Sequence, residues 1–291
     1  MSAAAPAPGA EVAAPAYRVD GPTAVTGDWR RFVHLATTLA VMDFKLRFFG
    51  SVLGYLWSLL RPLMLFGILY FVFSQIVRIG GGVENYPLQL LIGVLLFTYF
   101  SEVTGRAVTS MVDQETLVRK VSFPRMAIPV SVALTASFNL ALNLLTVGAF
   151  VVAGGVAPRL SWLLVPIPLV LLVVLATGVA MLVSALYVPF RDLKPIWDVL
   201  LQALFYATPI FYPVQLLLDY DERIAHAALT NPLAALVVET RHLILGDAAP
   251  GAAEAIGGGV RLLLPLGVVV GLAALGFGVF NRMAPRVAEE L

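Results

Sequence analysis

Residues with catalytic potential are few in this 291-residue sequence. There is no cysteine, which excludes disulfides, thiol catalysis and Cys-ligated metals. The three histidines, His34, His226 and His242, are too widely spaced to indicate a metal triad. The sequence also lacks the phosphate-binding string GxxxxGK[ST]. We therefore expect no catalytic residue, no metal, no cofactor and no ATP site in this chain.

Polar side chains placed inside long apolar runs form a second group. Glu102 and Arg106 are spaced i,i+4, which favours an ion pair on a helix, and Asn139 and Asn143 share a helix face in the same way. Such groups are costly in hydrocarbon, so each requires an explanation. Hydrogen bonding between helices is the simpler interpretation, and a hydrated path through the protein is the functional one.

A charged stretch, Asp113 to Pro129, separates two of these apolar runs. It is too short to be a domain and too amphipathic to be a slack connection. A membrane protein needs such a bridge to receive force from a soluble partner. The alternative is that its bases Arg119, Lys120 and Arg125 serve only to fix the membrane topology.

The composition identifies the elements that must position these residues. With 59% hydrophobic and 13% charged residues, the sequence predicts an integral membrane protein. A net charge of +1 gives no indication of nucleic-acid binding, and we expect none. Six apolar runs can each supply the roughly 20 residues that cross a bilayer, the fifth only just: Leu59–Val77, Leu88–Met111, Met126–Val152, Trp162–Val188, Pro195–Tyr212 and Val260–Phe280.

Basic residues predict the orientation of the six spans. With a cytoplasmic N-terminus, thirteen Lys and Arg residues fall in the inner segments and five in the outer ones. This bias predicts a multi-pass protein of the bacterial inner membrane with both termini cytoplasmic. The transmembrane domain then covers residues 58–282, and residues 283–291 form a cytoplasmic C-terminus.

The N-terminal region divides into two parts. Residues 1–28 are rich in Ala and Pro and predict a disordered cytoplasmic tail. Over residues 29–57, apolar residues recur every three or four positions among basic ones, which predicts an amphipathic helix in the membrane interface. The alternative is an ordinary packed helix of a soluble cap.

A second short helix is expected before the last span. Asn231 followed by Pro232 is typical of a helix start, and a helix from Leu233 to Leu245 would be about 20 Å long, too short to span. We expect a re-entrant or interfacial helical hairpin over residues 215–245, on the outer side. A surface loop with one helix is the alternative.

Four strings in a fixed order resemble one family. They are DFKLRFFGSVLGYLWSLLRPL at Asp43–Leu63, LVRKVSFPR at Leu117–Arg125, VPFRDLKPIW at Val188–Trp197 and ATPIFYPV at Ala207–Val214. Together they look like a type-2 ABC exporter permease, of the subgroup that exports lipid-linked polysaccharides such as O-antigens, teichoic acids and galactans. The similarity covers about residues 29–282.

The resemblance implies a homodimeric permease that is not catalytic alone and is driven by a separate nucleotide-binding ATPase subunit, which holds ATP and Mg. It places a coupling helix at about residues 113–125 and a smaller contact in the next inner loop, for which a simple polar turn is the alternative. The implied contacts are Glu115, Thr116, Leu117, Val118, Arg119, Lys120, Phe123, Pro124, Arg125, Arg191 and Asp192.

The resemblance also implies contacts with a lipid-linked glycan. A cytoplasmic entrance for the lipid pyrophosphate would use Lys45, Arg47 and Arg61, although anionic membrane lipids would attract the same charges. Aromatic and polar span residues could line the path, while many of the aromatics would instead face lipid. The path candidates are Tyr70, Phe97, Tyr99, Phe100, Glu102, Arg106, Asn139, Asn143, Phe205 and Tyr206.

Two other functions remain open at this point. An ABC exporter of another lipid or of a drug would show the same topology. A membrane-embedded enzyme acting on lipid-linked sugars would need a carboxylate or histidine cluster at one membrane face, and none stands out in the sequence. The interpretation we favour is a permease that moves a lipid-linked polysaccharide out of the cytoplasm.

Overall fold

The computed structural model describes residues 29–48, 52–116 and 123–290. Within these ranges every regular element is a helix and none is a strand. The all-α class predicted from the sequence is therefore confirmed. The high content of Leu, Ala and Val in long uninterrupted runs explains this, because helices satisfy their own backbone hydrogen bonds where no water is present.

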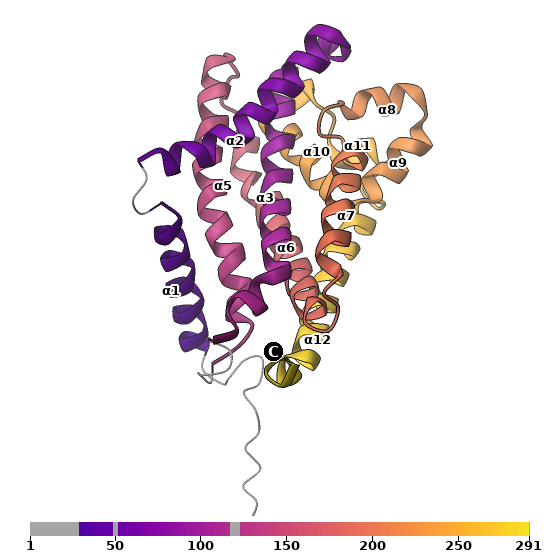
Figure 1. The fold of residues 1–291 in the computed structure, drawn as a ribbon. Coiled ribbons are helices and arrows are strands. Elements are labelled where there is room, and N and C mark those ends of the chain that lie inside the picture. Colours follow the sequence, from indigo (N-terminus) through magenta and orange to yellow (C-terminus); the bar gives the residue numbers. More distant parts are fainter. Residues whose placement is uncertain (1–28, 49–51, 117–122, 291) are drawn as a thin grey trace, which may run out of the picture.

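Four long helices form an up-and-down bundle, in which α3 is the central member (Figure 1). Helix α3 packs against α5 and α6. Its apolar side chains, among them Leu90 and Leu91, are fully buried. Helices α6 and α12 pack closely along their lengths. The four helices are α3 (Tyr86–Asp113), α5 (Ala127–Ala153), α6 (Pro166–Tyr187) and α12 (Leu263–Glu290).

Helix α2 (Val52–Tyr70) slants across the upper half of the bundle and continues as a π-helical segment, Phe71–Ile76 (Figure 1). It contains Pro62, which removes one backbone donor from the helix. Many of its side chains are exposed, including Trp57 and Ile68. One flank of α2 is therefore left free to form the wall of a groove.

In the described part of the chain, five helices are long and apolar enough to cross a membrane. Their bounds lie within a few residues of five of the predicted runs. They are Leu56–Ile76, Tyr86–Asp113, Ala127–Ala153, Leu160–Tyr187 and Leu263–Ala284. The coarse prediction of a multi-pass helical protein is thus confirmed, whereas the complete six-span arrangement is not.

The fifth predicted run corresponds to α7 (Leu193–Ala207), which has only 15 residues and a length of about 22 Å. The helix stops at Thr208, whose φ of −94° and ψ of 136° are extended. Pro209 explains this end, because a proline disfavours helical geometry in the residue before it. The chain then continues without regular structure to Pro213.

Short helices fill the upper right of the molecule (Figure 1): α8 (Val214–Tyr220), α9 (Glu222–Thr230), α10 (Pro232–Leu245) and α11 (Ala252–Ala255). The side chain of Asn231 accepts a hydrogen bond of 3.1 Å from the backbone N–H of Leu233, and Pro232 is the first helical residue. The helix start predicted at this point is therefore confirmed. Helix α10 packs against α3 and α6 and is mostly buried.

Helix α1 (Trp29–Phe48) runs lengthwise beside the lower half of α5 (Figure 1). Its buried face consists of Phe32, Ala36 and Ala40. Met42 and Leu46 belong to the apolar stripe expected from the sequence, yet they are 55% and 74% exposed and point away from the bundle. Small and aromatic side chains both face the bundle: Ala36 and Ala40 are buried, and the ring of Phe44 lies 5.5 Å from that of Phe138 on α5.

Candidate functional site

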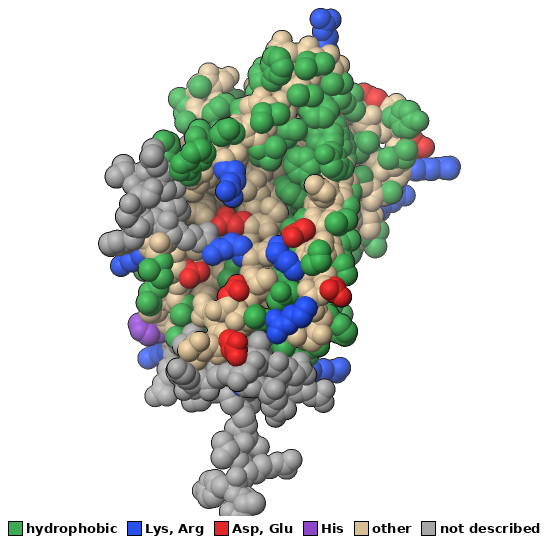
Figure 2. All heavy atoms as spheres, in the orientation of Figure 1, with side chains coloured by type: hydrophobic (Ala, Val, Ile, Leu, Met, Phe, Trp, Pro, Cys, Tyr) green, Lys and Arg blue, Asp and Glu red, His purple; other side chains and the backbone are tan. Residues whose placement is uncertain are grey.

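A polar cleft of about 970 Å³ opens between α2, α3, α5 and α7. Figure 2 shows charged side chains of both signs gathered in the middle and lower part of this face, below a mainly hydrophobic region. The cleft contains side chains from all four helices: Trp57, Ser58, Arg61, Pro62, Thr98, Ser101, Glu102, Gly105, Arg106, Thr109, Asn139, Asn143, Lys194, Asp198 and Leu201.

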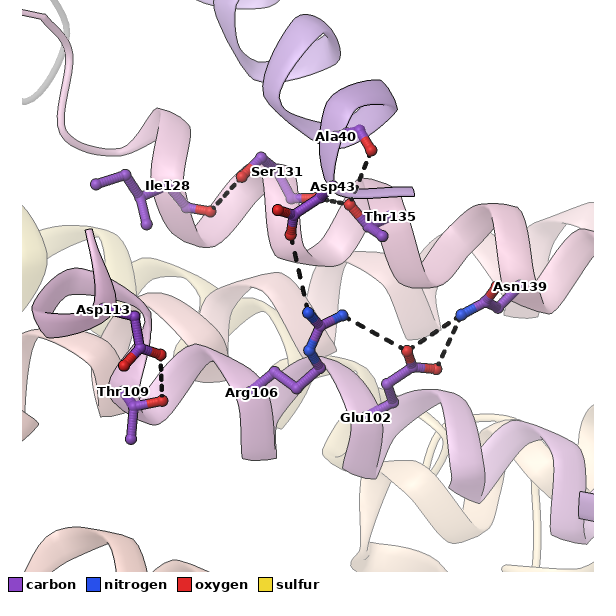
Figure 3. A network of polar contacts seen from close by, with 10 residues as sticks. All are labelled: Ala40, Asp43, Glu102, Arg106, Thr109, Asp113, Ile128, Ser131, Thr135 and Asn139. Carbon is purple, nitrogen blue, oxygen red and sulfur yellow. Dashed lines mark hydrogen bonds and ion pairs between the residues drawn. The ribbon is translucent and has the colours of Figure 1, made fainter. Parts of the chain in front are cut away.

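Arg106 and Glu102, on α3, lie at the centre of the cleft. One guanidinium nitrogen of Arg106 lies 3.8 Å from the Glu102 carboxylate, which confirms the predicted i,i+4 pair. The other lies 3.8 Å from Asp43 on α1. Glu102 also accepts a hydrogen bond of 3.1 Å from the amide of Asn139 on α5 (Figure 3). One network therefore links α1, α3 and α5.

Two amides line the α5 side of the cleft. The Nδ2 group of Asn139 donates to Glu102, and that of Asn143 donates to the Asn139 carbonyl at 2.9 Å. Neither Oδ1 atom has a hydrogen-bond partner among the residues described. Both amides thus lie on one face of α5, as the i,i+4 spacing predicted.

The opposite wall of the cleft carries charges on α2 and α7. Lys194 donates to Asp198 at 2.6 Å, an i,i+4 pair near the start of α7. Arg61 is exposed, and no ion pair joins it to another described residue. Neither Lys194 nor its pairing with Asp198 was predicted as part of the site, although the i,i+4 spacing of the two residues was a usable signal.

A second, smaller cleft of about 450 Å³ adjoins the first toward the lower end of the bundle. Arg106 and Thr109 line both clefts, so the two share a wall. The remaining lining residues come from the ends of α1, α3 and α5: Asp43, Ser110, Asp113, Gln114, Thr116 and Val132. Polar lining therefore extends from the centre of the bundle to its lower end.

The aromatic path candidates fall into two groups. Phe97, Phe205 and Tyr206 are joined by ring contacts of 5.1 and 5.5 Å, and Phe211 lies 6.0 Å from both Phe205 and Tyr206. Phe211 was absent from the expected set but lies at the centre of this cluster.

The other aromatic candidates lie apart from this cluster. Tyr70 stacks on Phe66 at 5.9 Å, the hydroxyl of Tyr99 lies 3.2 Å from Ser137, and Phe100 is buried in the core. The sequence alone could not separate the two groups, because both have the same composition.

The coupling candidates are only partly visible. Leu117, Val118, Arg119 and Lys120 lie outside the described residues. Glu115 is half-buried and Thr116 is exposed at the end of α3. In contrast, Phe123, Pro124 and Arg125 are buried in this chain, where Phe123 packs with Phe32, Met111 and Phe280. Burial lowers the pKa of Arg125.

The remaining basic candidates are distributed over three places. Lys45 is exposed on α1 but does not line the cleft, and the side chain of Arg47 is outside the described part. Arg191 lies 5.3 Å above the ring of Tyr187, and Asp192 is exposed before α7. Of the three expected phosphate contacts, only Arg61 is placed in the cleft. No group that could hold a metal occurs among the described residues.

A multi-pass helical protein with a charged cleft between its helices has the general form of a membrane transport subunit. The chain belongs to the ABC-2 type transporter family, which matches residues 34–240. The family predicted from the four sequence strings is therefore confirmed. The family description is that of a transporter.

Individual relatives share most of their length with this chain. The O-antigen export system permease protein RfbA of Klebsiella pneumoniae is 28% identical over 258 residues, which are 88% of this chain and 95% of that protein. Its namesake in Myxococcus xanthus is 32% identical over 222 residues, with 74% and 84% covered. The polysialic acid transport protein KpsM of Escherichia coli is 24% identical over 209 residues, with 71% and 80% covered.

Proposed function

We propose that this chain is the membrane-spanning permease subunit of an ATP-driven exporter of a lipid-linked polysaccharide in the bacterial inner membrane. The main support for this proposal is the sequence similarity to an O-antigen export permease, which covers 88% of this chain and 95% of the relative. The similarity therefore covers nearly the full length of both proteins. The polar cleft within the bundle supports the same function, because a charged headgroup needs hydrated groups to cross an apolar layer.

The energy would come from a separate ATPase subunit that binds ATP and Mg, since the sequence has no phosphate-binding loop. The stretch at residues 113–125 would dock on this partner. Because Phe123 and Arg125 are buried, they would anchor this stretch to the bundle, and the residues before them would contact the partner. Force applied near Thr116 would then reach the core directly, and two copies of the chain would form the pore between them.

The orientation follows from the charge distribution. Thirteen basic residues fall in the segments that the sequence predicts to be inner and five in the outer ones, so the inner segments would be cytoplasmic, with both termini. Helix α7 together with residues 208–213 would complete a sixth crossing, and α8 to α11 would form the outer re-entrant region. The exposed Met42 and Leu46 on α1 would then rest in the membrane interface.

In this orientation the two clefts open toward the cytoplasm. Arg61 would contact the phosphate of the lipid carrier. Lys45 and Arg47 on α1 would attract this phosphate before it reaches Arg61. The aromatic cluster around Phe211 would then offer ring faces to the sugar chain. Ring faces suit a polymer that must slide, because each contact is weak and tolerant of sequence.

The test is reconstitution of the chain with an ATPase encoded beside it. We expect the two to co-purify and the ATPase rate to rise when polyprenyl-pyrophosphate-linked glycans are added to the vesicles. The control is a vesicle that contains polyprenol without phosphate or sugar. Stable transport or hydrolysis by the chain purified without any ATPase would contradict the proposal.

A further inference from the structure

Arg106 is held unusually loosely for an arginine inside a helical bundle. Its two carboxylate partners, Asp43 and Glu102, lie at 3.8 Å, beyond the distance of a good hydrogen bond. Its Nη1 atom is buried and has no hydrogen-bond partner. An arginine has five N–H donors in a planar fork, which match the oxygens of a phosphate group. Much of this donor capacity is unused.

The position of Arg106 makes that capacity accessible to a ligand. Its side chain is 38% exposed and lines both clefts, so a group entering from the lower cleft meets it before reaching Asn139. In Figure 3 the guanidinium lies between the Asp43 and Glu102 carboxylates, with its plane reaching from α3 toward α1. Any anion that binds Arg106 from the lower cleft must compete with Asp43.

The sum of the charges around the cleft also indicates that Asp43 and an incoming anion compete for Arg106. Three cationic side chains line the larger cleft, Arg61, Arg106 and Lys194, against the two carboxylates of Glu102 and Asp198, which leaves a net charge of +1. Asp43, on the other side of Arg106, reduces this to zero. An incoming anion is therefore favoured only if the Asp43 carboxylate moves away.

We propose that Arg106 binds the phosphate of an anionic lipid headgroup. In the absence of the lipid, the Asp43 carboxylate occupies the side of the guanidinium that the phosphate takes over. The inference rests on the proposed export function and adds a residue and an exchange step to it. No bond is made or broken in the exchange. One charge-assisted contact replaces another, and the phosphate forms the shorter hydrogen bonds that Asp43 does not make.

The exchange has a mechanical consequence for α1. The first half of α1 is anchored by Phe32 and Ala36, which are buried in the lower core. The second half contacts the bundle in three ways: through Asp43, through the hydroxyl of Thr135, which donates to the Ala40 carbonyl at 3.3 Å, and through the ring of Phe44, which lies 5.5 Å from that of Phe138 on α5. Loss of the Asp43 contact would loosen this second half. Because α2 follows closely in the chain, the α2 wall of the cleft would move with it.

The binding test uses the full chain in lipid nanodiscs, with polyprenyl pyrophosphate as the probe and native mass spectrometry as the measurement. Asp43→Asn is expected to tighten binding about fivefold, the effect of removing one partly exposed competing ion pair. Arg106→Gln is expected to weaken it at least tenfold, and Arg106→Lys less. Inorganic pyrophosphate is expected to bind much more weakly than the lipid.

A matched control separates exchange at Arg106 from a change in overall charge. Asp247 lines neither cleft and pairs with Arg159 at 3.5 Å, so Asp247→Asn removes the same charge and one ion pair without touching Arg106. We expect unchanged affinity in this variant. Equal tightening in both variants, or weaker binding in Asp43→Asn, overturns the proposal. Equal binding of inorganic and lipid pyrophosphate overturns the assignment to a lipid headgroup.

The movement of α1 can be followed because the chain has no cysteine. In Ala40→Cys, maleimide labelling is expected to rise several-fold when polyprenyl pyrophosphate is added, whereas Ala36→Cys stays protected. Thr135→Cys reports on the same contact from α5 if the first variant does not fold. A constant labelling rate at both positions 40 and 135 overturns the release of α1. These assays need no ATP, so their failure is distinguishable from a failure of export.

Discussion

Arg241 is a buried cation whose neighbours include no carboxylate. It is 2% exposed, and its guanidinium donates to the carbonyls of Gln89, Pro209 and Ile210 at 2.6 to 2.7 Å. Burial lowers its pKa to about 10, which still leaves it protonated at neutral pH. The arginine therefore joins α10 to α3 and to the irregular segment after α7. The carbonyls of Pro209 and Ile210 need a donor because both residues lie outside any helix.

We predict that Arg241→Met destabilises the protein strongly, because it leaves buried carbonyls without partners. A loss of roughly 3 kcal/mol is expected, which would lower the unfolding midpoint by roughly 5–10 °C. Thermal unfolding of the detergent-purified chain would measure this. The matched control is Arg159→Met, since Arg159 is 45% exposed and pairs with the fully exposed Asp247. Equal midpoints for the two variants would show that the carbonyl contacts contribute nothing.

Sequence reasoning succeeded for site residues whose partner lies one helical turn away. The Glu102–Arg106 pair was predicted from its spacing alone. It gave no indication where the partner is distant in sequence: the contact of Asp43 with Arg106 was not predicted. Arg241 was treated only as a basic residue of the outer region, because nothing local indicates that its partners come from two other segments.

At the scale of helices, the contact between α6 and α12 depends on two glycines. The backbones approach so closely that a Cβ atom on Gly276 would overlap the carbonyl oxygen of Gly178, and one on Gly178 would lie 2.5 Å from the Cα of Ala273. Close backbone approach at small residues is the usual way in which helices associate in a membrane, where apolar side chains gain little by leaving lipid.

We predict that Gly276→Ala separates α6 from α12 and destabilises the bundle, although alanine is the better helix former by about 1 kcal/mol. The control, Gly271→Ala, lies on the same helix with open space at its Cβ position. It should be neutral or slightly stabilising. Unfolding midpoints and the monodispersity of both purified variants would decide between close packing and helix propensity. A Gly276→Ala variant as stable as its control would contradict the close-packing argument.

The long helices were predictable from the apolar runs, since five of the six runs agree with membrane-length helices to within a few residues. The exceptions have physical reasons. Helix α7 stops early because of Pro209, a signal present in the sequence but outweighed there by the apolar run. On α1, Ala36 and Ala40 carry no strong hydrophobic signal, so their burial was not predicted, although small residues permit the closest contact.

At the scale of the whole molecule, the lower end of the bundle gathers the parts that must move together. The buried Phe123 packs in one cluster with Phe32 of α1, Met111 of α3 and Phe280 of α12. A push on the segment before Phe123 would therefore be shared among three helices at once. Packed cores of this kind shift as units between discrete arrangements and do not deform gradually.

The coupling stretch gives the prediction that tests this arrangement. Arg119→Glu combined with Lys120→Glu should weaken assembly with the ATPase subunit, because charge reversal replaces attraction by repulsion at the contact rim. Co-purification and glycan-lipid-stimulated ATPase activity would measure the effect, and insertion into the membrane should be preserved. The control is Arg282→Glu, an exposed basic residue near the end of α12. If the two bases act only on topology, the double variant will instead insert poorly while every correctly inserted molecule still couples to the ATPase.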